Sequence, residues 1–186
     1  MKKTFLIIGS NSFSGSQFVN FLLENNNNVL GVSRSEEINE VYLPYKWDNS
    51  NLKDFNFFQI DLNKNLNELT EILNQFKPEY IVNFAAQGMV AQSWESPQDW
   101  YQTNVVGQVK LHDVLRKMNF IKKYVHVTTP EAYGSSNGWI KENFNFSPST
   151  PYAVSRAACD LHLMSFFKAY SFPVVFTRSA NVYGPG

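Results

Sequence analysis

Short apolar runs alternate with longer segments of helical periodicity along this chain. The apolar runs that predict strands are Thr4 to Ile8, Asn28 to Val32, Asn56 to Ile60, Tyr80 to Phe84, Lys123 to Thr128 and Val174 to Arg178. The helical patterns cover Ser14 to Glu24, Leu66 to Gln75, Pro97 to Met118 and Pro151 to Tyr170. This alternation is typical of parallel strands joined by crossover helices. It predicts a doubly wound α/β fold with helices on both faces of the sheet, and 1–186 as one domain.

Two of the predicted helices carry clear start signals. Ser96-Pro97 and Thr150-Pro151 each place an N-cap candidate before a proline at the first helical position. Between the second and third strands, residues 36–55 show no repeat. We predict a long irregular connection there.

Composition and charge exclude several functional classes. Lys+Arg and Asp+Glu are balanced at 16 each, so no long-range field attracts nucleic acid or an anionic membrane. The single Cys159 cannot form an internal disulfide, which favours a reducing, cytoplasmic compartment. His112, His126 and His162 are scattered without metal-ligand spacing, so the sequence predicts no metal site. No apolar run approaches the ~20 residues needed to span a bilayer.

A glycine-containing turn follows the first strand and predicts a dinucleotide site. Its sequence, GSNSFSG, lies between a strand and a helix whose N-terminal amides would face a pyrophosphate. Two of the three glycines of such a turn are present, and Ser12 stands in place of the other. Either the backbone lies slightly farther from the phosphates there, or the Ser12 hydroxyl contacts them. The candidate residues of this turn are Gly9, Asn11, Ser12, Phe13 and Gly15.

The end of the second strand bears on the choice of cofactor. Val32-Ser33-Arg34-Ser35 lacks the acidic residue that binds a ribose 2′-hydroxyl. Arg34 could pair with a 2′-phosphate instead, which favours NADP over NAD; the alternative is a solvated arginine. Asp61 and Leu62, after the third strand, are candidates for holding the adenine. We expect residues 36–55 to pack near this adenosine end.

The segment from Thr128 to Arg156 carries candidate catalytic chemistry. Tyr152 precedes the cation Arg156 by four residues, so the two would lie one turn apart on one helix. A fixed positive charge nearby favours the ionised phenolate, and a phenolate can remove a proton from an alcohol.

In their order along the chain, these features resemble the extended short-chain dehydrogenases/reductases, of the NAD-dependent epimerase/dehydratase type. Within them the chain is similar to the nucleotide-sugar 4,6-dehydratases, those of the dTDP-glucose group in particular. The resemblance implies a Rossmann-like fold that binds NAD(P). The motifs that carry it are the glycine turn, Ala85-Ala86, Thr128-Thr129-x-Glu131, Tyr152-x-x-x-Arg156 and Asn181-Val182-Tyr183-Gly184-Pro185.

By this resemblance, Tyr152 removes the proton of the sugar 4-hydroxyl while Thr129 hydrogen-bonds the same oxygen. Glu131 matches the glutamate that removes the C5 proton in dehydratases. Pro130 stands where the family has an aspartic acid that protonates the leaving 6-hydroxyl. Arg156 replaces a lysine, so it can supply a field on Tyr152 but cannot relay a proton.

The resemblance also implies further contacts. The cofactor contacts are Ala85, Ala86, Gln87, Asn104, Thr128, Tyr152 and Arg156, in addition to the residues at the adenosine end. The substrate contacts are Ser93, Thr129 and Asn181. The expected substrate is a nucleotide-diphosphate sugar, and the expected assembly is a homodimer through a four-helix interface. The chain stops after the Asn181 motif, before a substrate lobe, so we expect a fragment of a longer protein.

Three functions remain open on the sequence. A 4,6-dehydratase is favoured by Thr129, Glu131 and Tyr152. A 4-epimerase or 4-keto reductase is suggested by Pro130 and by the altered loop from Met89 to Gln92. A cofactor-binding module with little catalysis is suggested by Ser12, Arg156 and the missing lobe.

Overall fold

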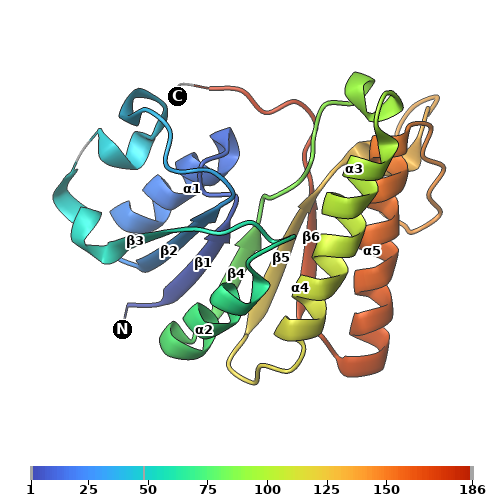
Figure 1. Cartoon of the computed structure of the whole chain (residues 1–186). Coiled ribbons are helices and arrows are strands. Elements are labelled where there is room, and N and C mark those ends of the chain that lie inside the picture. The colour runs from blue at the N-terminus through green and yellow to red at the C-terminus, as the bar shows by residue number, and fades with distance from the viewer. Residues whose placement is uncertain (1, 48, 185–186) are drawn as a thin grey trace.

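A single parallel sheet of six strands forms the centre of the molecule (Figure 1). The computed structural model describes residues 2–47 and 49–184. The strands are β1 (Thr4–Ile8), β2 (Asn28–Ser33), β3 (Phe55–Gln59), β4 (Tyr80–Asn83), β5 (Lys123–Thr128) and β6 (Val174–Arg178). Their order is β3-β2-β1-β4-β5-β6, so the direction of winding reverses between β1 and β4. The predicted fold class, a Rossmann-like doubly wound sheet, is confirmed.

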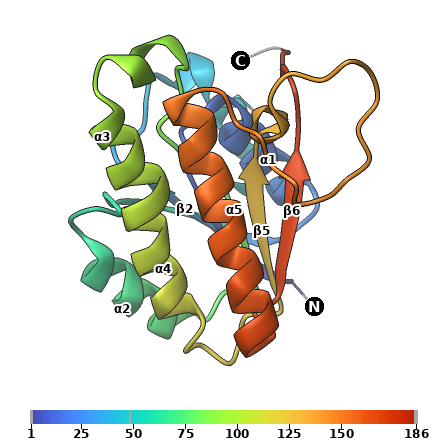
Figure 2. The ribbon, with the colours of Figure 1, turned by 90° about the vertical axis from the view of Figure 1, so that its right-hand side faces the viewer.

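Helices cover both faces of this sheet, as the two views show (Figures 1 and 2). The long helices are α1 (Phe13–Glu24), α2 (Leu66–Phe76), α4 (Gln108–Leu115) and α5 (Pro151–Tyr170). Leu6 and Ile8 of β1 pack with α2, α4 and α5, whereas Ile7 packs with α1 on the opposite face. This follows from the two-residue period of a strand. Both faces of the central strands are therefore buried.

One predicted helix, Pro97 to Met118, is divided in the structure. It consists of α3 (Pro97–Tyr101), a π-helical segment η5 (Gln102–Gly107) and α4, and it ends at Leu115. π-helical turns insert a residue into a helix and are frequent at functional sites. Here the segment carries the buried Asn104.

The connection between β2 and β3 is more ordered than predicted. It contains three short 3₁₀ helices, η1 (Glu40–Tyr42), η2 (Pro44–Lys46) and η3 (Asn49–Asp54). Leu43 and Tyr45 are buried against α1, so most of the connection covers that helix. Only its first part, at Ile38, borders the pocket where we expected the whole connection to pack.

The two helix start signals have different outcomes. Thr150 caps α5, since its side chain accepts a hydrogen bond from the Ala153 amide at 3.1 Å. Pro97 is the first residue of α3, but the Ser96 side chain makes no capping hydrogen bond. In the described ranges, no helix is both long enough and apolar enough to cross a membrane.

Candidate active site

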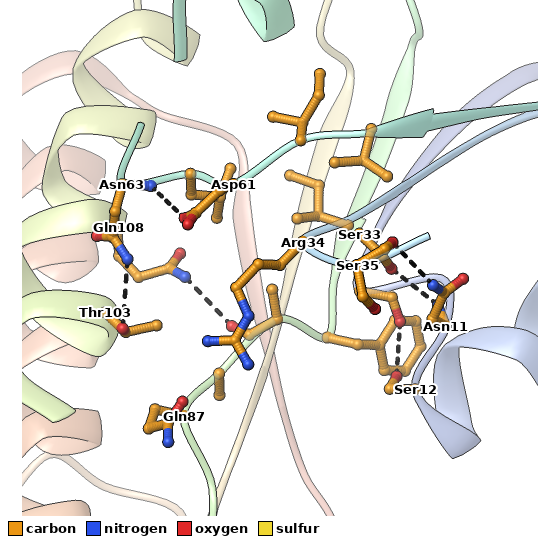
Figure 3. A pocket seen from close by; sticks show the side chains of 18 of the residues that line it. Asn11, Ser12, Ser33, Arg34, Ser35, Asp61, Asn63, Gln87, Thr103 and Gln108 are labelled. Carbon is orange, nitrogen blue, oxygen red and sulfur yellow. Dashed lines mark hydrogen bonds between the residues drawn. The ribbon is translucent and has the colours of Figure 1, made fainter. Parts of the chain in front are cut away.

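A pocket lies at the carboxyl ends of the central strands, beside the point where the strand order reverses. Ligands of doubly wound sheets bind at this position. Its walls come from the turn after β1, the ends of β2, β3 and β4, and η5 (Figure 3). Of the predicted cofactor residues, it is lined by Gly9, Asn11, Ser12, Arg34, Asp61, Leu62, Ala85, Ala86 and Gln87.

The two glycines of the β1–α1 turn allow very close backbone packing. Gly9 has a φ of +86°, and a Cβ there would lie 2.8 Å from the Ala85 nitrogen. A Cβ on Gly15 would lie 2.1 Å from the Gly9 carbonyl oxygen. Neither position accommodates a side chain without movement, so the start of α1 is held close to β1 and β4.

Ser12 is the N-cap of α1. Its hydroxyl accepts a hydrogen bond from the Gly15 amide at 3.1 Å and donates one to the Gly9 carbonyl at 2.7 Å. The hydroxyl therefore closes the turn, which is a role that the sequence reasoning did not consider. The predicted phosphate contact remains a prediction.

Asn11 joins the glycine turn to the end of β2. Its backbone amide donates to the Ser33 hydroxyl at 2.9 Å, and its side-chain amide donates to the Glu36 carbonyl at 2.7 Å. Its Oδ1 atom is buried without a hydrogen-bond partner. Ser33 is thus engaged within the protein, whereas Ser35 is exposed at the pocket wall.

Arg34 reaches into the pocket from the end of β2 (Figure 3). It is exposed, and no carboxylate of residues 2–47 or 49–184 forms an ion pair with it. A charged side chain in this situation is available to an anionic ligand. Asp61, across the pocket, accepts a hydrogen bond from the Asn63 amide at 2.9 Å and keeps its second oxygen for other partners.

Asn104 fixes the loop after β4. Its Oδ1 accepts from the Gln87 amide at 2.7 Å, and its Nδ2 donates to the Gln87 carbonyl and to the Ser155 hydroxyl, each at 3.0 Å. Ser155 in turn donates to the Tyr152 carbonyl at 2.7 Å. The structure therefore connects the pocket to the first turn of α5, which carries Tyr152.

Glu131 lies on a short 3₁₀ helix, η6 (Pro130–Tyr133), after the end of β5, and Thr129 directly precedes this helix. Thr129 is its N-cap, and its hydroxyl accepts a hydrogen bond from the Glu131 amide at 3.2 Å. Thr129 is 7% exposed, whereas the Glu131 side chain faces solvent. The helix η6 packs against α5, so these residues and Tyr152 belong to the same end of the sheet.

Arg156 is buried instead of lying on the helix surface. It is 2% exposed, and its Nη2 donates a hydrogen bond to the Val127 carbonyl of β5. Its Nε and Nη1 are buried without partners. Arg156 is therefore not a solvated surface cation, since its guanidinium packs against β5.

An ion pair between the buried Asp160 and the partly buried Arg178 holds the β5–η6 junction. Arg178 of β6 donates to Asp160 at 2.7 Å and to the Thr129 carbonyl at 3.0 Å. The Thr128 hydroxyl also donates to Asp160, at 3.1 Å. Burial raises the pKa of Asp160, and the charge of Arg178 opposes this rise. Thr128 is thereby engaged with α5.

The remaining predicted residues lie in varied settings. Ser93 is fully buried, and its hydroxyl donates to the Val90 carbonyl and accepts from the Tyr152 amide. Asn181 is exposed. Phe13 borders a separate apolar groove with Val182 and Tyr183, not the main pocket. Pro185 of the Asn181 motif lies outside the described residues.

Together, these features fit a dinucleotide. The turn leaves no room for a Cβ at Gly9 or Gly15, the N-terminus of α1 faces the pocket, and Arg34 is free to pair with a phosphate. The donor set is therefore complementary to NAD(P).

Sequence reasoning missed several residues of this site. Gln108 lines the pocket and donates to the Ala85 carbonyl at 3.2 Å. It lies four residues after Asn104, and this spacing could have identified it. Thr103, Asn63 and the pair Asp160–Arg178 carried no local signal, because distant segments bring them to the site.

Comparisons with known proteins agree with this geometry. A family model described as GDP-mannose 4,6 dehydratase matches residues 6–186. A probable dTDP-glucose 4,6-dehydratase of Sinorhizobium fredii is 30% identical over 196 residues, covering 97% of this chain and 53% of the relative. The chain spans about half the length of the curated relatives it matches.

Solved structures of two activities are similar to this chain. DesIV, a dTDP-glucose 4,6-dehydratase from Streptomyces venezuelae with NAD and TYD bound, has a TM-score of 0.86 at 29% identity, covering 98% of this chain and 57% of DesIV. A UDP-N-acetylglucosamine 4-epimerase from Methanobrevibacter ruminantium M1, in complex with UDP-N-acetylmuramic acid, also has a TM-score of 0.86 at 29% identity. That alignment covers 99% of this chain and 57% of the epimerase.

Proposed function

Because the chain belongs to the GDP-mannose 4,6 dehydratase family, within the extended short-chain dehydrogenases/reductases, we propose that it carries the catalytic half of a nucleotide-sugar 4,6-dehydratase. The reaction oxidises the sugar C4 hydroxyl with bound NAD(P) and eliminates water across C5–C6. The observation that carries this proposal is the placement of Thr129 at the N-cap of η6 and of Glu131 within η6, which packs against α5, the helix that carries Tyr152. An alcohol-oxidising pair and a carboxylate base are then available at one end of the sheet.

Each residue has a defined task in this proposal. Tyr152 takes the proton of the C4 hydroxyl, and Thr129 hydrogen-bonds the same oxygen. A bound nicotinamide would supply the reversible hydride acceptor for C4, so the overall reaction would leave the cofactor unchanged. Arg156 follows Tyr152 by one turn on α5 and contributes a positive charge to this end of the site, but it cannot relay a proton. Glu131 removes the C5 proton, which the C4 ketone makes acidic.

Because residue 130 is a proline, this position supplies no acid for the elimination of water. The departing 6-hydroxyl must receive its proton from water or from another group. The 4-epimerase alternative needs no such acid, and the similarity to the Methanobrevibacter epimerase gives it support. A 4-keto reductase and a cofactor-binding module without catalysis are the remaining alternatives.

For the cofactor, we propose NAD(P) with NADP favoured. The exposed and unpaired Arg34 supports NADP, because a guanidinium binds a 2′-phosphate with paired hydrogen bonds. The similar structures named above include one solved with NAD, which supports the nicotinamide dinucleotide class. Arg34 is therefore the residue through which the choice can be tested.

We also propose a homodimer in a reducing, cytoplasmic setting. Apolar side chains are exposed on the outer side of α3, η5 and α5; they are Tyr101, Val106, Val154, Leu161 and Phe167. Apolar surface of this kind is buried when helices pack between subunits. The partner small molecule is a nucleotide-diphosphate sugar.

The experiment is a product analysis by mass spectrometry. The purified protein is incubated with NAD(P) and dTDP-, GDP-, CDP- or UDP-hexoses, with Tyr152→Phe as the control. The proposal predicts a product lighter by one water molecule, no net change of cofactor, and no product with the control variant. An isomer of equal mass would indicate the epimerase, and stoichiometric loss of NADPH would indicate the reductase. Cofactor binding without any turnover would indicate a cofactor-binding module without catalysis.

A further inference from the structure

A cluster of metal-ligating side chains lies in the core, away from the pocket. We call His112, His126, His162 and Cys159 the histidine cluster. They come from α4, β5 and α5, and His112, His126 and Cys159 are each 0% exposed. One ligand atom from each of these three lies within 4.8 Å of the others. The sequence predicted no metal site because these residues are far apart in the chain, but the fold brings them together.

One ring nitrogen of His112 and one of His126 lie near polar groups. His112 Nε2 lies 2.9 Å from the Tyr124 hydroxyl, and His126 Nε2 lies 3.5 Å from Asp160 Oδ1. The Nδ1 atoms of both rings are buried without hydrogen-bond partners. Metal-bound histidines have this arrangement, with one nitrogen toward the metal and the other toward a carboxylate or another acceptor.

His162 extends the same cluster. It follows Cys159 by three residues on α5, so both side chains lie on one side of that helix. Its ring stacks on His112 with 5.4 Å between the centroids, and its Nε2 is buried without a partner. Three potential ligands therefore converge in the core, and His162 lies beside them, stacked on His112.

We propose that the histidine cluster binds a zinc ion through His112, His126 and Cys159, with His162 as the fourth ligand. Two or more imidazoles with one thiolate suit Zn²⁺ better than Mg²⁺ or Ca²⁺, which prefer oxygen. In a tetrahedral zinc site the ligand atoms are about 3.3–3.8 Å apart, given bonds of about 2.0–2.3 Å. The three side chains must therefore move together by about 1 Å, and the His162 ring must turn toward them.

The charges around the cluster set the conditions for binding. Arg156 and Arg178 are the cations nearby, and Asp160 is the carboxylate. Arg156 opposes a metal cation but favours the thiolate of Cys159, which must lose its proton on binding. The negative charges of the Cys159 thiolate and of Asp160 together offset the positive charges of Arg156 and Arg178. The charge of the zinc ion is then added to a group of side chains with no net charge.

This site differs from the dinucleotide pocket and does not depend on the proposed reaction. None of the four residues lines that pocket. Its role is structural, since it joins α4, β5 and α5 behind the strand that leads to Thr129. Because His112, His126 and Cys159 are closed to solvent, we expect the ion to enter during folding.

Cobalt substitution tests the proposal on the whole chain. The protein is unfolded, stripped of metal with a chelator and refolded with Co²⁺, and excess metal is removed by gel filtration. Cys159 is the only cysteine, so any thiolate-to-cobalt charge-transfer band must come from it. We expect this band, a tetrahedral visible spectrum, displacement by Zn²⁺, and a single zinc ion in protein refolded with zinc.

Two variants test the proposed ligands. Cys159→Ala removes the thiolate with little change of shape and should abolish the charge-transfer band; circular dichroism shows whether it has folded. His126→Gln should weaken zinc retention at least tenfold. Folded wild-type protein that retains neither zinc nor cobalt would overturn the proposal, as would a cobalt spectrum without the thiolate band. Either result would indicate a metal-free polar core. The spectrum of the wild-type protein tests the proposal even if a variant fails to fold.

Discussion

Replacing Gly15 by alanine tests the close contact that positions the start of α1. A Cβ at this position would lie 2.1 Å from the Gly9 carbonyl oxygen and 2.8 Å from the Ser12 hydroxyl. That carbonyl accepts hydrogen bonds from the Ser12 amide and hydroxyl, so it cannot move without disturbing the turn. The contact must open by about 1 Å, which costs about 1–3 kcal/mol. Alanine recovers about 0.5–1 kcal/mol through its higher helix propensity.

The net expectation is a loss of about 1–2 kcal/mol in the free energy of unfolding. For a chain of this size, that lowers Tm by about 3–6 °C. The displaced α1 amides should also weaken NAD(P) binding about tenfold, which corresponds to about 1.4 kcal/mol. Differential scanning fluorimetry and calorimetric titration measure the two effects.

Gly88→Ala is the matched control, because a Cβ there meets no atom within 4 Å. Its Tm and its cofactor affinity should equal those of the wild type. If Gly15→Ala behaved like Gly88→Ala in both measurements, the close-packing argument for the nucleotide turn would be refuted.

Three further predictions concern charged and titratable groups. Arg34→Ala should weaken NADP binding about tenfold or more and NAD binding little, because only NADP presents a 2′-phosphate to this side chain. Calorimetric titrations with the two cofactors measure the losses, and equal losses would contradict the preference for NADP. In the metal-free protein, burial lowers the pKa of His112 and His126 well below 6.5, so the unfolded chain binds more protons and stability should fall as pH drops below 6.5. The free energy of unfolding should fall by at most about 2.7 kcal/mol per pH unit. Urea unfolding at several pH values above about 5 measures this dependence, and a free energy of unfolding that does not change with pH would contradict the reasoning. Asp160→Asn should destabilise the protein by about 3 kcal/mol, since it removes the carboxylate that pairs with the partly buried Arg178, whereas Asp113→Asn on the surface should change little.

Local pattern was sufficient to predict most of the fold. β1, β5, β6 and α5 have the predicted bounds, because their apolar spacing and flanking turns act locally. The π-helical segment at Gln102–Gly107 was missed, since one inserted residue scarcely changes the period of a long helix. The 3₁₀ helices of the β2–β3 connection are too short for any period to be detected.

The candidate site was only partly predictable. Tyr152 and Arg156 were expected on one helix and lie there, but the Arg156 side chain donates to the Val127 carbonyl, a contact that depends on β5. The links from Arg178 to Asp160 and Thr129 join segments that are distant in the sequence. Motifs identify the residues that meet ligands, whereas the tertiary fold determines the partners that hold them.

The central claim is that alcohol oxidation at Tyr152 precedes elimination at Glu131. Its most direct test is the near-ultraviolet absorbance of reduced nicotinamide during a single turnover with a nucleotide sugar. Glu131→Gln should oxidise the sugar but fail to remove the C5 proton, so reduced cofactor should accumulate. In the wild type it should appear only transiently, and in Tyr152→Phe it should not appear. Absence of reduced cofactor in the wild type and in Glu131→Gln, with every sugar tested, would contradict the account.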